Sequence, residues 1–292
     1  MISRRQSLVE PELHPMATKG VRATPTRQFA ADFSNLLFEF TFNGIGSPRI
    51  SEQEFEDRFD NLDPVEQFTR SILFADIDTT PQAAATQAGE IVCQLYDQIP
   101  TIRSACWDDA IFTGYDPAAP QPMIVPMAYL GSEATTIFRY ASFLEKLDWI
   151  NVGPIPRMMT WHAHRMTGID IHPGATIGKC FGIDHGTGIV IGETVRIGDY
   201  VSMYSGVVLG ALRVDADQTA KRRHPEIGDD VKIYANATAL GCIKIDKGVT
   251  IGANTYIFNR NIRQNAVVKR LANGSTVVEH RLADGRIIVE TL

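Results

Sequence analysis

A repeat of six residues in the second half of the chain constrains its fold more than any other feature. Counting in sixes from Ile171 reaches only Ile or Val as far as Val207. The count resumes at Ile227 and runs to Ile257, with Ala239 as the one exception. A period of six fits neither the 3.6-residue turn of a helix nor the two-residue alternation of a strand. Short fixed repeats of this kind are typical of a β-helix, in which each hexad supplies one strand and one corner.

The aliphatic residue of each hexad is expected to point into the β-helix. Successive coils then stack at strand spacing, about 4.8 Å, and bury an aliphatic column that no single coil could bury. A second series, offset by two residues, also holds at Ile191, Ile197, Met203 and Leu209. The alternative is a run of short strands in a sandwich. Twelve aliphatic residues in the thirteen positions of the main series make that alternative the weaker one.

The sequence before the repeat predicts two regions. Residues 1–28 are polar and rich in Pro, Thr and Arg, and are expected to form a mobile N-terminal arm. Residues 29–165 carry apolar side chains at helical spacing and predict a helical domain. Pro100 and residues 116–126 interrupt this pattern, and the last helix is expected over roughly residues 128–147.

The repeat itself predicts a β-helix over residues 166–262, with a polar inserted loop at 210–223. Residues 263–292 contain three strand-like segments separated by Asn-Gly and Asp-Gly, which suit tight hairpin turns. We expect these segments to form a meander that caps the last coil. The predicted fold class is therefore α+β, with helices first, a parallel β-helix next and a short β extension at the end.

Composition and charge exclude several classes of protein. The net charge of −6 and the lack of a basic stripe argue against a nucleic-acid binder. No apolar run approaches the roughly 18 residues of a membrane span, and no apolar stretch follows the N-terminal arginines as a secretory signal requires. The four cysteines show no CxxC pair and are expected to be reduced thiols in a cytoplasmic protein.

The repeat region contains three histidines, His172, His185 and His224, none of which falls on the inward series. We expect them at corners or on the outer surface, where a ligand can reach them. Asp170 and His185 are fifteen residues apart, which places them near the same edge of the β-helix if a coil holds three hexads. A carboxylate that holds one imidazole nitrogen leaves the other one basic, as a general base requires.

Simpler interpretations stand beside this one. His185 lies in a glycine-rich turn and fits a surface histidine equally well, while His172 fits a His-Pro-Gly corner and is assigned no role. No two histidines lie a few residues apart within one coil, so no metal is expected. Cys180 has no evident histidine partner or basic setting and is not expected to act as a nucleophile.

Three runs resemble serine O-acetyltransferase, a family of hexapeptide-repeat acyltransferases. They are TGIDIHPGA (167–175), IDHGTGIVIGET (183–194) and RHPEI (223–227), and the dense match extends from about Arg157 to Asn254. Upstream, YDPA (115–118) looks like the family's Asp-Pro-Ala element. The resemblance implies a left-handed β-helix, trimers with active sites between subunits, and often a dimer of trimers.

The reaction implied by the resemblance is acetyl transfer from acetyl-CoA to L-serine, giving O-acetyl-L-serine for cysteine biosynthesis. His185 would be the general base on the serine hydroxyl, and Asp170 would orient it. Acetyl-CoA would lie near the inserted loop. The residues that the resemblance places beside acetyl-CoA are Gly210, Ala211, Ala235, Lys221 and Arg222, the last two near its phosphates.

The serine site implied by the resemblance is made of charged groups. Asp116 and Asp184 would hold the substrate ammonium and Arg223 its carboxylate, which are the charge complements that an amino acid requires. His224 would line the same site from across a subunit boundary.

Two departures from the family leave other functions open. The inserted loop begins Leu209-Gly210-Ala211 where many members have Leu-Gly-Gly, which makes homoserine or another small hydroxy-amino acid an alternative acceptor. Many members have a C-terminal tail that binds O-acetylserine sulfhydrylase, but this chain ends in Leu292 after strand-like sequence, which argues against that partner. A non-catalytic solenoid scaffold is a further alternative. Against it stands the joint presence of five polar residues for which a scaffold has no use: Asp170, Asp184, His185, Arg223 and His224.

Overall fold

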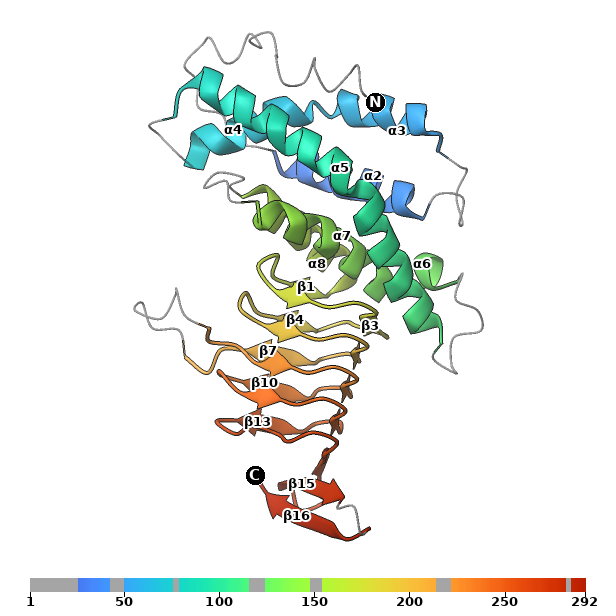
Figure 1. Cartoon of the computed structure of the whole chain (residues 1–292), viewed down its shortest axis with the longest axis vertical. Helices are drawn as coiled ribbons and strands as arrows, with labels where there is room; N and C mark the ends of the chain where they lie inside the picture. The colour runs from blue at the N-terminus through green and yellow to red at the C-terminus, as the bar shows by residue number, and fades with distance from the viewer. Residues whose placement is uncertain are drawn as a thin grey trace. The chain divides into compact units, whose positions relative to one another are not determined.

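The structure is a computed structural model of the chain (Figure 1). It describes residues 26–42, 50–75, 79–115, 124–147, 154–213, 222–281 and 285–292. Residues 1–25 of the predicted N-terminal arm, Asp116, Lys221 and most of the inserted loop lie outside the described residues. By their contacts, residues up to Ser104 and Ile137–His162 form one compact unit, and Ala105–Thr136 with Ala163–Leu292 form a second.

The helical prediction is confirmed for the described part of the N-terminal half. The helices are α2 (Arg27–Thr41), α3 (Glu52–Asn61), α4 (Pro64–Ala75), α5 (Pro81–Gly114), α6 (Val125–Ala128), α7 (Leu130–Glu145) and α8 (Ile155–Thr167). Side-chain caps start two of them, because the hydroxyls of Thr26 and Ser51 accept hydrogen bonds from backbone N–H groups three residues on. The first unit has an aromatic core in which Phe33 contacts the rings of Phe29, Phe59 and Phe68.

Two details of the helical prediction are wrong. Pro100 lies inside α5 and does not end the helix. The last helix is α8 and not the one ending near residue 147, because Ile155, Met159 and Ala163 recur at four-residue spacing and bury one face of α8. Among the described residues, no helix is long and apolar enough to cross a membrane.

The second unit contains a parallel β-solenoid, as the six-residue repeat predicts (Figure 1). Its strands are β1 (Asp170–Ile171), β2 (Thr176–Ile177), β3 (Gly182–Ile183), β4 (Val190–Ile191), β5 (Arg196–Ile197), β6 (Ser202–Met203), β7 (Val208–Gly210), β8 (Glu226–Ile227), β9 (Lys232–Ile233), β10 (Thr238–Leu240), β11 (Lys244–Ile245), β12 (Thr250–Ile251) and β13 (Tyr256–Phe258). We call the sheet β1-β4-β7-β10-β13 sheet A, the sheet β2-β5-β8-β11 sheet B, and the sheet that runs from β3 through β6, β9 and β12 sheet C. Each of the first four coils contributes one strand to each sheet, and the last coil meets sheet B only through an isolated bridge between Ile262 and Ile245.

Aliphatic residues stack in register inside the solenoid. In sheet A, Ile171 pairs with Ile191, and Ile191 with Leu209, and all three are buried. Inward residues of consecutive strands are six apart, with two exceptions. Ile183 and Ile191 are eight apart, and Leu209 and Ile227, which flank the inserted loop, are eighteen apart. Two extra residues therefore enter the corner between β3 and β4. They shift strands β4 to β7 onto the offset series, while the main six-count from Ile189 to Val207 occupies buried corner positions.

The C-terminal segment adds three strands to sheet C. They are β14 (Val267–Arg270), β15 (Thr276–Arg281) and β16 (Ile287–Thr291). Strand β14 is parallel to β12, while β14, β15 and β16 form an antiparallel meander. Arg260 of the last coil donates hydrogen bonds to the Glu290 carboxylate and to the Thr291 carbonyl oxygen. The predicted meander thus both extends the sheet and faces the last coil.

Candidate active site

The corner between β3 and β4, residues 184–189, carries His185 and is called the His185 corner. The two extra residues let the chain turn outward here, with positive φ angles at His185 (59°) and Gly186 (76°). A side chain at residue 186 would collide with Ile169, so this position requires glycine. The Gly188 N–H bonds to Gly168 O at 2.8 Å, and the Asp170 N–H to Ile189 O at 2.9 Å. These bonds hold Asp170 beside the corner, as the residue count predicts.

The ring of His185 is open to solvent. Its side chain is 78% exposed, and its Nε2 lies 3.8 Å from Asp184 Oδ2. Asp170 Oδ2 lies 3.6 Å from Nδ1 of His164, a residue near the end of α8 that the sequence analysis did not single out. The predicted pairing of Asp170 with His185 stays a prediction. The corner nonetheless gathers two imidazoles and two carboxylates on one edge of the solenoid.

A second polar cluster lies between β4 and β5, where the inserted loop rejoins the solenoid. We call residues 192–194 and 222–225 the His224 corner. The Arg223 guanidinium forms an ion pair with Glu193, and the Arg223 N–H donates to Thr194 Oγ1 at 3.0 Å. Thr194 Oγ1 lies 2.7 Å from His224 Nδ1, and the Thr194 N–H donates to the same nitrogen at 3.2 Å. One threonine thus fixes both Arg223 and His224.

His224 is buried, which corrects the expectation that its ring is freely accessible. Only 6% of the residue is exposed. The ring packs against Gly192, where a Cβ would collide with Nε2, so burial depends on a residue without a side chain. Because a backbone N–H donates to Nδ1, that nitrogen is the acceptor and Nε2 carries the proton. Burial lowers the pKa of His224 and the charge of Arg223 lowers it further, while Glu193 acts in the opposite direction.

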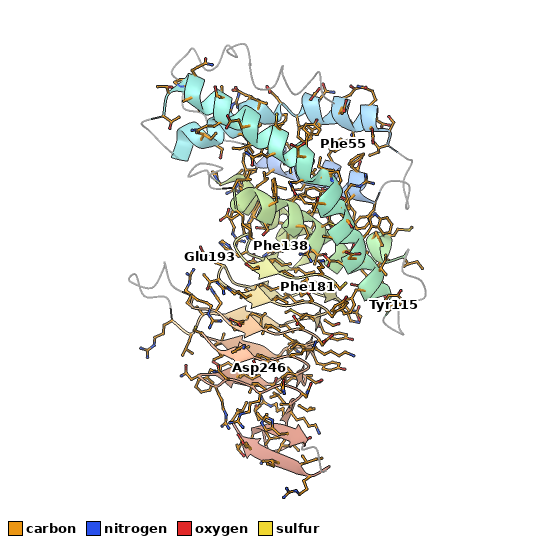
Figure 2. The ribbon with its side chains drawn as sticks, viewed as in Figure 1. Phe55, Tyr115, Phe138, Phe181, Glu193 and Asp246 are labelled. Carbon is orange, nitrogen blue, oxygen red and sulfur yellow. The ribbon has the colours of Figure 1, made fainter. Side chains whose placement is uncertain are left out.

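The two corners belong to different edges of the three-sided solenoid. The His185 corner joins sheet C to sheet A, and the His224 corner joins sheet A to sheet B. Figure 2 shows Glu193 of the His224 corner and Tyr115 on opposite sides of the solenoid. One chain therefore does not bring its predicted base together with its predicted carboxylate-binding arginine along a single edge.

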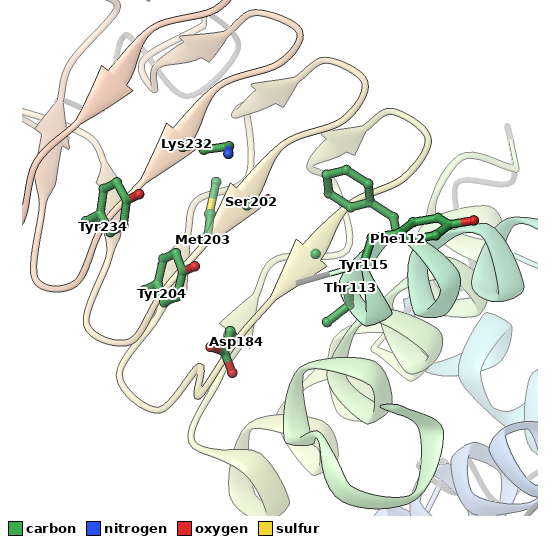
Figure 3. A pocket seen from close by; sticks show the side chains of 10 residues that line it. Phe112, Thr113, Tyr115, Asp184, Ser202, Met203, Tyr204, Lys232 and Tyr234 are labelled. Atoms are coloured by element: carbon green, nitrogen blue, oxygen red, sulfur yellow. The ribbon is translucent and has the colours of Figure 1, made fainter. Parts of the chain in front are cut away.

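A groove of about 320 Å³ runs along the outer face of sheet C, and Asp184 lines it (Figure 3). The rings of Tyr204 and Tyr234 stack at 5.2 Å in this groove, and Lys232 lies across from them. Tyr115, the residue before the predicted Asp116, also lines the groove. These tyrosines were not predicted from the sequence, because the residue types at outward positions of the hexads follow no repeating pattern.

The residues predicted to contact acetyl-CoA fall on two edges. Ala235 lies on the same edge as the His185 corner, two coils further on. Hydrogen bonds link the successive corners of this edge, from the Gly206 N–H to Thr187 O and from the Asn236 N–H to Ser205 O. Gly210 is the last residue of β7 and Ala211 follows it, on the edge of the His224 corner. Arg222 forms an ion pair with Glu226 at 2.8 Å.

Two further groups bear on the chemistry. Burial raises the pKa of the Cys180 thiol, and the carboxylates of Asp108 and Asp109 raise it further, so the thiolate is disfavoured. This supports the prediction that Cys180 is not a nucleophile. Across the described ranges, no group of three or more His, Cys, Asp or Glu side chains could hold a metal ion.

Comparison with known proteins places this geometry in context. Residues 224–259 match the bacterial transferase hexapeptide family (six repeats). The plasmid serine acetyltransferase of Synechococcus elongatus is 41% identical over 187 residues, which are 62% of this chain and 57% of that protein. A serine acetyltransferase of Staphylococcus xylosus is 43% identical over 145 residues, 49% of this chain and 63% of that protein. The chain thus spans less than two thirds of the length of these curated relatives.

A solved structure is similar over most of the chain. The crystal structure of serine acetyltransferase isoform 3 from Entamoeba histolytica, in complex with cysteine, has a TM-score of 0.68 and 30% identity. The similarity covers 91% of this chain and 92% of that one. It therefore includes both the helical half and the β-solenoid.

Proposed function

Because the chain belongs to the serine acetyltransferase family, we propose that it transfers the acetyl group of acetyl-CoA to the hydroxyl oxygen of L-serine. The observation that carries this proposal is the His185 corner. There an exposed imidazole projects from a corner lengthened by two residues, with the Asp184 carboxylate near it and the Asp170 backbone hydrogen-bonded to the same corner. The curated relatives that match this region are named serine acetyltransferases.

In the proposed reaction, His185 removes the proton from the serine hydroxyl as that oxygen attacks the carbonyl carbon of the acetyl thioester. The tetrahedral intermediate then breaks its carbon–sulfur bond, and the protonated imidazole returns the proton to the CoA thiolate. No acyl-enzyme forms. Asp170 would stabilise the imidazolium and orient the ring, a contribution that requires the carboxylate and the ring to meet when substrate binds.

The substrate-binding part of the proposal rests on charge. Asp184, and Asp116 outside the described residues, would bind the ammonium group, and Arg223 would bind the carboxylate. Glu193 and Thr194 hold the Arg223 guanidinium and backbone in place. The Entamoeba histolytica relative was solved with cysteine, an amino acid that differs from serine by sulfur in place of oxygen, which supports a site for a small amino acid.

We place the complete site between two chains. The His185 corner and the His224 corner lie on different edges of one solenoid, so they can face each other only when the His185 edge of one copy packs against the His224 edge of the next. A heterologous contact of this type closes into a ring when the rotation between neighbouring chains allows it, and a three-sided solenoid suits the three-fold rotation of a trimer. His224 would then line the serine site from the neighbouring chain. Acetyl-CoA would lie in the same seam, near Ala235 on one side and Gly210, Ala211 and Arg222 on the other.

The experiment that tests the proposal measures thiol release from acetyl-CoA. Purified protein is mixed with acetyl-CoA and, in parallel, with L-serine, homoserine or no acceptor. We expect release that depends on L-serine, with the highest kcat/KM for that acceptor, and a product whose mass equals serine plus one acetyl group. A higher kcat/KM for homoserine would assign homoserine as the acceptor in place of L-serine. The absence of thiol release with every acceptor would refute the proposal.

A further inference from the structure

Strand β16 is the free edge of sheet C, whose order is β16-β15-β14-β12-β9-β6-β3. Three consecutive aliphatic side chains on this edge are exposed: Ile287 by 52%, Ile288 by 46% and Val289 by 56%. Proteins normally protect a sheet edge with charges, bulges or a covering element, because its backbone groups can pair with another strand. An apolar edge strand of this kind indicates a surface for strand pairing.

The backbone groups that face outward on β16 follow from its pairing with β15. Ile288 and Glu290 lie opposite His280 and Val278, and the Leu292 N–H donates to Thr276 O at 2.9 Å. Even-numbered residues of β16 therefore direct their N–H and C=O groups toward β15. Because alternate residues of an antiparallel strand point to opposite sides, the N–H and C=O groups of Ile287 and Val289 point away from the sheet.

The last coil protects the C-terminal end of this edge. Arg260 donates to the carbonyl oxygen of Thr291 at 3.3 Å and pairs with the Glu290 carboxylate. The outward groups of Ile287 and Val289 lie just before this protected end. The open part of the edge is therefore short and begins after Gly285.

The open edge is complementary to itself. In an antiparallel pair with a two-fold axis at Ile288, Ile287 lies opposite Val289 of the partner subunit, and these are the residues whose backbone groups face outward. Two such pairs form four hydrogen bonds. Arg286 then lies opposite Glu290 of the partner subunit, twice, which adds opposite charges across the strands. A shift by two residues in either direction loses both charge pairs.

The side chains agree with the same register. Ile287 and Val289 of both copies gather on one face of the extended sheet. On the other face, Ile288 meets Ile288 of the partner subunit at a position without backbone hydrogen bonds between the paired residues, where side chains approach most closely. The backbone, the apolar side chains and the charges thus select one alignment.

We propose that β16 is a self-association surface through which two copies of this chain pair antiparallel about Ile288. This inference goes beyond the proposed function and does not depend on it. If three chains also assemble around their solenoids, the pairing joins two such trimers through their C-terminal meanders. The partner is a second copy of this chain, since the register and charges of β16 match β16 itself.

Disulfide trapping tests the register directly. Ile288→Cys and Ile287→Cys are each made in a Cys242→Ser background, which removes an exposed native thiol, and both are treated with a mild oxidant. Non-hydrogen-bonded cross-strand positions have the Cα separation that a disulfide needs. We expect Ile288→Cys to form a covalent dimer at least about 10-fold faster than Ile287→Cys. Equal rates, or no dimer from Ile288→Cys, would overturn the proposal.

Sedimentation velocity of the full chain tests the pairing without a cross-link. Val289→Pro removes an N–H that faces outward and leaves the bonds to β15 intact. Because the two-fold axis doubles the loss, the dissociation constant for pairing should rise about 10-fold or more. Unchanged acetyl transfer and circular dichroism would show that the variant is folded. Self-association that is unchanged by Val289→Pro would contradict the proposal.

Charge reversal distinguishes a second copy from another protein. Arg286→Glu alone and Glu290→Arg alone each place like charges opposite one another in a homotypic pair, so each should pair weakly. Mixing the two variants restores opposite charges at both positions, and association should return in the mixture. Weak association of each variant without recovery on mixing would refute self-pairing and leave β16 as a surface for a different strand.

Discussion

The His185 corner and the His224 corner hold their histidines in opposite ways. His185 is exposed, on a corner lengthened by two residues and stabilised by glycine at residue 186. His224 is buried, hydrogen-bonded to Thr194 and packed on Gly192. One histidine is open to a ligand, and burial lowers the pKa of the other and so favours its neutral form. This contrast fits the proposal that His185 of one chain acts as the base and that His224 of the next chain lines the serine site with a fixed side chain.

The contrast also supports the proposal that each site combines corners from two chains. The open corner contains carboxylates, and the rigid corner contains the arginine that would bind a carboxylate. Under the proposed function, the amino acid substrate carries both charges and would contact both corners. Each substitution below removes one part of this division of roles.

Removing the exposed imidazole should have the largest effect. His185→Ala is expected to lower kcat by roughly 10²- to 10⁴-fold, because the general base is lost, and to leave the KM for acetyl-CoA almost unchanged. Steady-state kinetics with L-serine measure both. His280→Ala in the meander is the matched control and should retain full activity. A loss below 10-fold for His185→Ala would assign the base to another residue.

Removing the guanidinium should affect binding of serine more than turnover. Arg223→Met is expected to raise the KM for L-serine by roughly 10- to 100-fold, the usual size of a lost hydrogen bond to a charged group. Arg223→Lys keeps the charge without the paired donors and should give an intermediate value. An equal KM for all three proteins would exclude Arg223 from the serine site.

Adding one methyl group beside the buried ring should have a smaller effect. Gly192→Ala places a Cβ against His224 Nε2 and displaces the ring, so kcat/KM for L-serine should fall by about 10-fold. In a His224→Ala background, Gly192→Ala should lower kcat/KM for L-serine little further, because the ring is no longer there to displace. Additive losses in the double variant would show that Gly192 acts by another route.

The pH dependence of stability should change least. The folded-state pKa of His224 is lowered from 6.5, so the unfolded chain binds a proton first as the pH falls. The free energy of unfolding should therefore decrease below about pH 6.5 and level off below the folded-state pKa. Urea unfolding of the solenoid at about pH 7.5 and about pH 5.5 measures this change. His224→Gln should reduce it, and an unchanged dependence would contradict the assignment.

Much of the fold follows from the hexad alone, because each inward aliphatic residue has a fixed place in a stacked column. The same count could not show that two extra residues between Ile183 and Ile191 project His185 outward. Burial of His224 depends on a contact with Gly192, thirty-two residues earlier in the sequence, and on the absence of its side chain. Such pairs carry no periodic signal.

Contacts between side chains on the outer surface of the solenoid could not be predicted from the sequence either. Tyr204 and Tyr234 lie thirty residues apart but stack on neighbouring coils, because the inserted loop lengthens one coil without changing the register. His164 comes from the helix before the repeat and reaches Asp170 only through the fold. The sequence therefore predicts the scaffold well and the composition of its surfaces poorly.

Mixing inactive chains tests most directly the claim that each active site combines corners from two chains. His185→Ala and Arg223→Ala proteins are unfolded together in equal amounts, refolded, and assayed at a serine concentration well below the raised KM of the Arg223 variant, where each protein alone has little activity. If neighbouring chains share each site, roughly one quarter of the sites regain both native corners, because the contact between chains is heterologous. Serine-dependent thiol release should then recover to that fraction of the wild-type rate. No recovery, with assembly intact, would contradict the shared site.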